Sequence, residues 1–215
     1  MDEIAETRAG AGLQPFLALE MLARAKVLEA EGREILHLEA GEPGIGPAPA
    51  VREAIAHHVV NERQPYTEAK GLESLRRALG DYYADRHGTA IDAERIIVTT
   101  GSSTGFVLAF LAGFAPGARI GVTRPGYPAY VNILAALGFE PVEIEVMPQD
   151  GWRLSVGAVA KAHGAGPLDG LMVESPANPT GAMLPRADLA ALAAFCTGNG
   201  IRLIPRGGQD VEGLV

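Results

Sequence analysis

The sequence predicts an α/β fold, in which helices cover both faces of a mainly parallel sheet. Two observations support this prediction. From about residue 95 onward, short apolar segments alternate with segments compatible with helices, the pattern of a parallel sheet. Hydrophobic residues make up 47% of the 215 residues and charged residues 20%, which provides enough apolar material for a core. Right-handed crossovers place helices on both faces of such a sheet, so three layers (αβα) are expected.

The first part of the chain is less regular. Residues 1–14 show no apolar periodicity and predict a loose arm. Apolar residues recur every three or four positions in 15–31, which predicts an amphipathic helix with Pro15 at its start and Gly32 past its end. A short strand is predicted at 35–38, and further helices at about 48–60 and 72–87.

Five short apolar segments are candidates for the strands of the sheet. They are residues 96–98, 119–122, 142–146, 171–173 and 201–204. Helices are predicted after the first four, at about 103–114, 127–137, 155–163 and 186–197. In sheets of this kind, ligands bind at the carboxyl ends of the strands, so the loops that follow the strands are the places to seek a site.

The loop at 99–105 is rich in glycine, serine and threonine, and it leads from a predicted strand into a helix. Small residues let the backbone approach an anion, and the amides at a helix start favour negative charge. Hydroxyl groups of Ser102 and Ser103 can add hydrogen bonds, so the loop is a candidate phosphate site. The alternative is a helix cap rich in Ser and Thr. The loop is neither a Walker A motif nor Gly-x-Gly-x-x-Gly.

Two later loops carry groups suited to a planar ligand. Prolines and a glycine fix the path around Tyr127, whose ring could stack on such a ligand; the alternative is that it packs into the core. Asn178 offers donors and an acceptor for a phenolic oxygen or a carboxylate, and Pro179 restrains it; the alternative is a simple Asn-Pro turn.

Charge and composition narrow the classes of function. The net charge of −8 without basic clusters argues against nucleic acid or an anionic membrane as the main partner. The single cysteine, Cys196, fits a reducing compartment, and we find neither a signal peptide nor a membrane-spanning stretch, so a cytoplasmic location is expected. His57 and His58 are adjacent and point to different helix faces, and we predict no metal site.

Several motifs, in their order and spacing, resemble one family. The chain resembles the class I/II aminotransferases of pyridoxal-phosphate fold type I over residues 13–204. The resemblance is carried by Gly41-Glu42-Pro43, Tyr66 with Gly71-Leu72 and Leu75-Arg76, Thr100-Gly101-Ser102-Ser103, Pro125-Gly126-Tyr127-Pro128, and Ser175-Pro176-Ala177-Asn178-Pro179-Thr180-Gly181.

The resemblance implies a role for each of these loops. It implies that Ser102 and Ser103 bind the phosphate of pyridoxal 5'-phosphate, that Tyr127 stacks on its ring, and that Asn178 bonds its phenolic oxygen. The implied reaction transfers an amino group between an amino acid and a 2-oxo acid.

The resemblance also implies an assembly and a domain plan. Gly41 is expected against the substrate carboxylate, and Tyr66 is expected to reach the phosphate in a partner subunit, which implies a homodimer. The implied organisation is an N-terminal arm at 1–14, part of a small domain at 15–47, and a large cofactor-binding domain at 48–215 that is incomplete at its C-terminus.

The chain departs from the family after Ile204. The family has an Asp-Glu segment there, whose Asp pairs with the pyridinium nitrogen, but this chain continues Pro205-Arg206-Gly207, and Asp210 is not assigned that role. Its lysines are Lys26, Lys70 and Lys161, and none matches the Schiff-base lysine. We therefore expect this chain alone to be marginally folded, with strand edges left unpaired, and catalytically inactive.

Other functions remain open from the sequence. A related carbon–sulfur lyase or decarboxylase would keep the fold and the cofactor but change the reaction. A non-catalytic remnant could bind a phosphate ligand or an intact paralogue. A nucleotide-binding α/β domain is the fourth possibility, and the lack of both glycine-rich nucleotide motifs argues against it.

Overall fold

The computed structural model describes residues 17–39, 41 and 44–207, and it divides the chain into two compact units. Unit 1 includes Ser74–Val215, and unit 2 is Pro15–Glu73. Within the described residues, no helix combines the length and the apolar character needed to cross a membrane.

Unit 1 is built on a four-stranded sheet in which every pairing is parallel. The strands are β1 (Arg119–Arg124), β2 (Glu140–Glu145), β3 (Gly170–Ser175) and β4 (Arg202–Gly207), in the order β2-β1-β3-β4. The helices are α4 (Ser102–Gly113), α5 (Pro128–Ala136), α6 (Val156–Ala165) and α7 (Arg186–Gly198). The predicted α/β class is confirmed, and the four predicted helices form; α5, α6 and α7 each connect consecutive strands, whereas α4 precedes β1.

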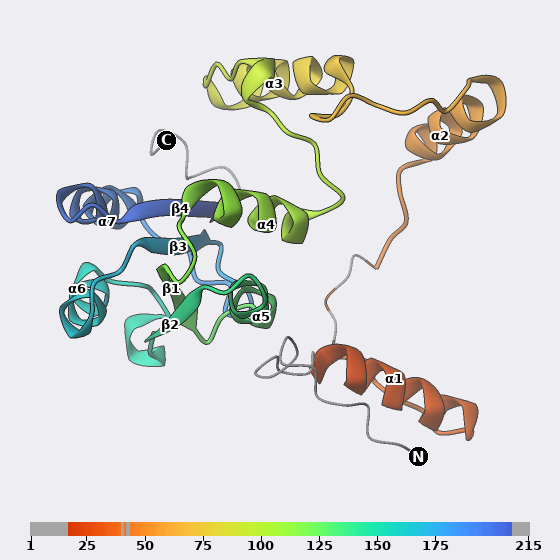
Figure 1. Cartoon of the computed structure of the whole chain (residues 1–215). Coiled ribbons are helices and arrows are strands. Elements are labelled where there is room, and N and C mark those ends of the chain that lie inside the picture. The colour runs from red at the N-terminus through yellow and green to blue at the C-terminus, as the bar shows by residue number, and fades with distance from the viewer. Residues whose placement is uncertain (1–16, 40, 42–43, 208–215) are drawn as a thin grey trace. The chain divides into compact units, whose positions relative to one another are not determined.

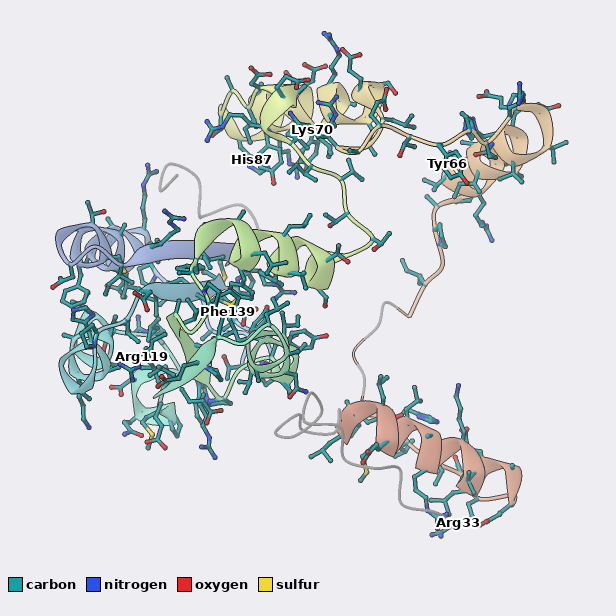
Figure 2. The ribbon with its side chains drawn as sticks, in the orientation of Figure 1. Arg33, Tyr66, Lys70, His87, Arg119 and Phe139 are labelled. Atoms are coloured by element: carbon teal, nitrogen blue, oxygen red, sulfur yellow. The ribbon has the colours of Figure 1, made fainter. Side chains whose placement is uncertain are left out.

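Helices cover both faces of this sheet, as the sequence predicts (Figure 1). Side chains alternate along β3, so Leu171 and Val173 enter the core beneath α6 and α7, whereas Met172 enters the core beneath α4 and α5. Strand β3 is buried along its whole length because it lies between two other strands and is covered on both faces. The α4/α5 core is largely aromatic, and Phe139 lies within it (Figure 2).

The direction of α4 follows from contacts at its C-terminal end. Arg202, at the start of β4, donates a hydrogen bond from Nη1 to the carbonyl oxygen of Gly113, at the end of α4, over 2.6 Å. Its guanidinium also lies 5.7 Å from the centre of the Phe114 ring. The end of α4 therefore lies at the amino edge of the sheet. The start of α4 points to the carboxyl edge.

Unit 1 has further elements besides the sheet and the four helices that cover it. Helix α3 (Glu73–His87) lies almost entirely in this unit, and its buried Arg76 donates to the carbonyl oxygen of Ala93 in the 3-10 helix η1 (Ala93–Arg95) over 2.7 Å. A second 3-10 helix, η2 (Pro148–Asp150), follows β2.

Unit 2 contains two helices, α1 (Leu17–Ala30) and α2 (Pro49–Asn61), close to the predicted bounds. His37 connects α1 to the segment after it. Its Nε2 lies 2.9 Å from Glu29 Oε1 and its Nδ1 lies 2.6 Å from Glu39 Oε1. Among the described residues of this unit, Ala25 alone is a buried apolar residue.

Two predicted strands are wrong. Residues 35–38 form no strand, and Leu36 and Leu38 are 85% and 94% exposed. Residues 96–98 also form no strand; the backbone N–H of Ile96 instead closes η1 by donating to Ala93. A strand needs a neighbour for its backbone groups, and no described segment pairs with either stretch. The predicted arm at 1–14 lies outside the described residues.

Candidate functional site

Three of the loops identified in the sequence meet at the carboxyl edge of the sheet. One precedes α4 and ends at Gly101, the second joins β1 to α5, and the third follows β3. Phe106 in the second turn of α4 contacts Tyr130 in α5 edge-on, with ring centres 5.0 Å apart, so the beginnings of these two helices are close together. The parallel pairing of β1 with β3 places the second and third loops at the same edge.

The start of α4 leaves several hydrogen-bonding groups available. Gly101 is the residue before the helix, at φ 116°, a conformation that favours glycine, and no side chain caps the helix. Ser102 and Ser103 are exposed, and their hydroxyl groups have no hydrogen-bond partner among the described residues. The alternative of a Ser/Thr cap therefore does not hold here. Free amides and hydroxyls at a helix start suit an anion.

Tyr127 is held at the start of α5. It precedes Pro128, the first residue of that helix, and its ring lies edge-on to Tyr130, with centres 5.2 Å apart and planes at 76°. It is partly buried against the α4/α5 core, whereas Tyr130 is fully buried. Packing into the core and contact with a ligand are thus compatible for Tyr127, because one part of its ring is anchored and another is accessible.

Asn178 lies on the exposed loop after β3. Its backbone N–H donates to Glu174 Oε2 over 3.3 Å. The loop is closed by hydrogen bonds from the N–H of Ala177 to the carbonyl of Ala182 and from the N–H of Gly181 to the carbonyl of Ala177, over 2.9 and 2.7 Å. The side-chain amide of Asn178 has no partner among the described residues. An ordered loop therefore presents a free amide group.

The remaining two predicted site residues belong to unit 2. Tyr66 lies fully exposed on the segment after α2 (Figure 2), and Gly41 is exposed with open space around it. The structure does not place unit 2 relative to unit 1, so it says nothing of where these two residues lie relative to the carboxyl edge. Of the six predicted site residues, it brings Ser102, Ser103, Tyr127 and Asn178 together at that edge.

A buried polar cluster at this edge was not predicted. The side chain of Glu174, at the end of β3, is 4% exposed. It accepts hydrogen bonds from the Tyr130 hydroxyl, from Arg206 Nη1 over 2.7 Å, and from the N–H of Asn178. Burial and the neighbouring Glu174 carboxylate raise the pKa of Tyr130, so its hydroxyl stays protonated and donates. The sequence offered one clue, a carboxylate that follows directly on the buried apolar run 171–173 within a strand.

Comparison with known proteins decides the family. The model of the family "Aminotransferase class I and II" matches residues 33–204, more than half of the chain. The chain belongs to this aminotransferase family. It is 40% identical over 194 residues to a valine–pyruvate aminotransferase of Mycobacterium tuberculosis, covering 90% of this chain and 50% of that protein. An arginine–pyruvate transaminase of Pseudomonas aeruginosa is 31% identical over 175 residues, covering 81% and 44%.

Solved aminotransferase structures share the fold. An aminotransferase from Mycobacterium tuberculosis has a TM-score of 0.86 at 38% identity, with 95% of this chain and 52% of that chain covered. The aspartate aminotransferase of Thermus thermophilus with maleate has a TM-score of 0.87 at 28% identity, with 94% and 53% covered. The chain thus spans about half the length of the aminotransferases it matches.

The groups at the carboxyl edge of this aminotransferase-family chain fit a phosphorylated aromatic ligand such as pyridoxal phosphate, the cofactor of the family. The start of α4 offers free donors for a phosphate, Tyr127 offers an anchored ring, and Asn178 offers a free amide. None of the three loops contains a lysine. No cluster of potential metal ligands occurs among residues 17–39, 41 and 44–207.

Proposed function

We propose that this chain is the cofactor-binding part of a pyridoxal-phosphate-dependent aminotransferase. The observation that carries the proposal is the convergence of the uncapped start of α4, the anchored Tyr127 and the free amide of Asn178 at one edge of a parallel sheet. A phosphate, an aromatic ring and a ring oxygen are the three features that these groups would recognise. When bound, the cofactor supplies an electron sink for the substrate's α-carbon.

Each loop then has a distinct task. Backbone amides of α4 and the hydroxyls of Ser102 and Ser103 would hold the phosphate, aided by the positive end of the helix dipole. The Tyr127 ring, anchored on Tyr130, would pack against the cofactor ring and exclude water there. The Asn178 amide, on a loop tied to Glu174, would donate to the ring oxygen and hold the cofactor in one orientation.

The proposal extends to substrates and assembly. We expect an amino acid and a 2-oxo acid as substrates, with Gly41 against the substrate carboxylate. A homodimer would let Tyr66 of one subunit reach the phosphate bound by the other, and its complete exposure leaves it accessible for that contact. Reaction types that share this cofactor, such as carbon–sulfur lysis and decarboxylation, need the same three loops.

We further infer that this 215-residue chain does not catalyse transamination by itself. Its lysines are Lys26 in α1, Lys70 before α3 (Figure 2) and Lys161 in α6, so none belongs to the loops that would hold the cofactor. A lysine that attached the cofactor covalently would also serve as the base that moves the substrate's α-proton, and these loops supply no lysine. The chain is expected to bind the cofactor reversibly.

Binding of pyridoxal 5'-phosphate to the purified chain tests the proposal. The single tryptophan, Trp152, lines a small crevice together with Glu174 and Ala177, so its fluorescence can follow the titration. We expect saturable binding, competition by inorganic phosphate, and about tenfold weaker binding in Tyr127→Ala and in Asn178→Ala, which is a loss of about 1.4 kcal/mol each. An amino acid with 2-oxoglutarate should give no turnover.

The matched control is Asn199→Ala at the end of α7, whose amide donates to the Phe195 carbonyl within that helix. Its affinity for pyridoxal phosphate should equal that of the original chain. Binding that is equally strong in all three variants would mean that the cofactor does not occupy the loops described above. Turnover of an amino acid would contradict the inferred lack of catalysis.

A further inference from the structure

One buried carboxylate at the carboxyl edge connects three separate elements. Glu174 Oε1 accepts from the Tyr130 hydroxyl in α5 and from Arg206 Nη1 in β4, over 2.7 Å for the arginine. Glu174 Oε2 accepts from the backbone N–H of Asn178 over 3.3 Å. Neither the established family nor the proposed cofactor contacts assign a role to this glutamate.

The location of the carboxylate follows from the sheet. Met172 and Glu174 point to the same face of β3 because side chains alternate, and Met172 belongs to the α4/α5 core. Arg206 pairs in register with Glu174 on the neighbouring strand β4, so the two side chains lie next to each other on that face. The arginine, 32% exposed, balances the charge of a carboxylate that is 4% exposed.

The loop after β3 has few other ways to anchor Asn178. Pro176 and Pro179 have no N–H, so only Ala177 and Asn178 offer backbone donors between them. The N–H of Ala177 is used inside the loop, where it donates to the carbonyl of Ala182. The bond from Asn178 to Glu174 is therefore the backbone hydrogen bond that ties this stretch to β3.

The Glu174 carboxylate also restrains the pair of rings formed by Tyr127 and Tyr130. The hydroxyl of Tyr130 donates to Glu174, and the ring of Tyr130 lies edge-on to Tyr127 at 5.2 Å. A shift of the carboxylate would move both the ring that supports Tyr127 and the backbone that carries Asn178. Replacing a buried ion pair by apolar residues of similar volume often leaves a protein equally stable or more stable. Stability therefore does not explain why an ion pair lies here, whereas a role in positioning neighbouring residues does.

We propose that Glu174 is a positioning residue that fixes Asn178 and Tyr127 relative to each other for binding of the cofactor ring. The role rests on the proposed function, because it assumes that these two residues contact the same ligand. Glu174 itself touches no ligand in this proposal. It acts through the Asn178 backbone on one side and through Tyr130 on the other.

The first experiment tests the connection from Glu174 to the backbone of Asn178. It measures hydrogen exchange in Glu174→Gln, on the full chain without ligand. Glutamine keeps the shape but has one acceptor oxygen where the carboxylate has two. That oxygen is expected at the Oε1 position, where the Arg206 cation and the Tyr130 hydroxyl both donate, so the amide NH2 faces the Asn178 N–H, which loses its acceptor. We expect exchange at the Asn178 amide to rise by about tenfold, the effect of losing one hydrogen bond to a charged group. The Leu184 amide, which donates to Ser175 Oγ at the other end of the loop, should not change.

Glu140→Gln is the matched control, because Glu140 pairs with Arg119 over 2.9 Å in the same sheet but at the amino edge. Exchange at Asn178 should be the same in this variant as in the original chain. Unchanged exchange at Asn178 in Glu174→Gln would overturn the proposal, whether or not the chain binds pyridoxal phosphate.

Ligand affinity tests the connection from Glu174 through Tyr130 to Tyr127. It also separates the positioning role of Glu174 from the proposed binding of the cofactor. Glu174→Gln should bind pyridoxal 5'-phosphate about tenfold more weakly, yet bind inorganic phosphate as the original chain does, because the groups that donate to Glu174 lie in α5, in β4 and in the loop after β3, and none of them lies in α4. Equal losses for both ligands would show a general structural defect and overturn the positioning role. If the original chain binds inorganic phosphate but no pyridoxal phosphate, the proposed function fails, and the exchange measurement still decides whether Glu174 positions Asn178.

Tyr130→Phe keeps the test decisive if Glu174→Gln does not fold. It removes the hydroxyl and leaves Glu174 bonded to Arg206 and Asn178. We expect weaker binding of pyridoxal phosphate with unchanged exchange at Asn178. Unchanged affinity for pyridoxal phosphate would refute the connection through Tyr130.

Discussion

Gly126 lies where the chain turns from the end of β1 into α5. A Cβ atom at this position would collide with the backbone carbonyl oxygen of Thr123 and would lie 3.3 Å from its Oγ1. Backbone cannot move away as a flexible side chain can, so the turn requires glycine. Because Tyr127 follows directly, this single residue sets the position of the ring that we assign to the cofactor.

Gly126→Ala should therefore destabilise unit 1. We expect the free energy of unfolding to fall by about 1–3 kcal/mol, the usual cost of overpacking, as measured by urea denaturation followed through Trp152. Gly164→Ala is the control, since a Cβ at Gly164 in helix α6 meets nothing within 4 Å. That change should stabilise the helix by up to about 1 kcal/mol. Equal stability of Gly126→Ala and the original chain would show that the turn relaxes freely.

Local motifs in the sequence point to the loops of the candidate site, but not to the contacts with distant residues that support these loops. The Ser102-Ser103 loop, Tyr127 and Asn178 each stand in a short motif next to a strand or a helix, and the fold brings them to one edge. Glu174 was not predicted because Tyr130 and Arg206 are 44 and 32 residues away from it in sequence. Its pairing with Arg206 depends on the register between β3 and β4, which no local pattern specifies.

Among the predicted strands, those that form are the ones whose pairing partners also lie in the described sheet. The apolar runs at 119–122 and 171–173 extend to β1 and β3 because each has strands on both sides. Residues 96–98 have the same apolar character but form no strand. Their side chains are only partly buried or exposed, and no described strand pairs with them. Composition shows that a segment can be a strand, but pairing decides whether it is one.

Helix α1 has one polar connection that depends on pH. Hydrogen bonds to Glu29 and then to Glu39 raise the pKa of His37 above its ordinary value of 6.5, and His37 lowers the pKa of Glu39. A histidine whose pKa is raised on folding stabilises the folded state while it is protonated. Its contribution is therefore complete below pH 6.5 and is lost as the pH rises through the higher pKa of the folded state.

Proton NMR titration of the His37 ring tests this connection. In Glu29→Gln the pKa of His37 should fall, because the bond to Glu29 is the largest cause of its rise. Glu20→Gln, at an exposed position earlier in the same helix, should leave it unchanged. A titration of His37 that does not respond to Glu29→Gln would mean that the segment after α1 does not fold back onto that helix in solution.

At the scale of the whole molecule, the two units differ in how much apolar surface they bury. Unit 1 has a core on each face of its sheet, with aromatic side chains on the α4/α5 side and aliphatic ones beneath α6 and α7. In unit 2, Ala25 is the single buried apolar residue among those described, and Val59, Val60 and Leu36 are largely exposed. Helices of 13–14 residues are marginal in water unless an apolar face is covered.

Hydrogen exchange should therefore separate the two units. Amides of β1 and β3 should be the slowest in the chain, because exchange there needs the sheet to open. Amides in the middle of α1 and α2 should exchange nearly as fast as in an unfolded peptide, while those of α7, a helix of similar length packed on the sheet, should be protected. The comparison of α2 with α7, 13 residues each, removes helix length as an explanation.

Repeating the exchange measurement at several protein concentrations identifies what could cover the apolar side chains of unit 2. Protection of α2 that is high at every concentration would contradict the expectation, since it would require burial within a single chain. Protection that grows with concentration would instead show that a second copy covers these side chains, because association depends on concentration and folding of one chain does not. The proposed homodimer would then directly stabilise unit 2, the unit to which Tyr66 belongs.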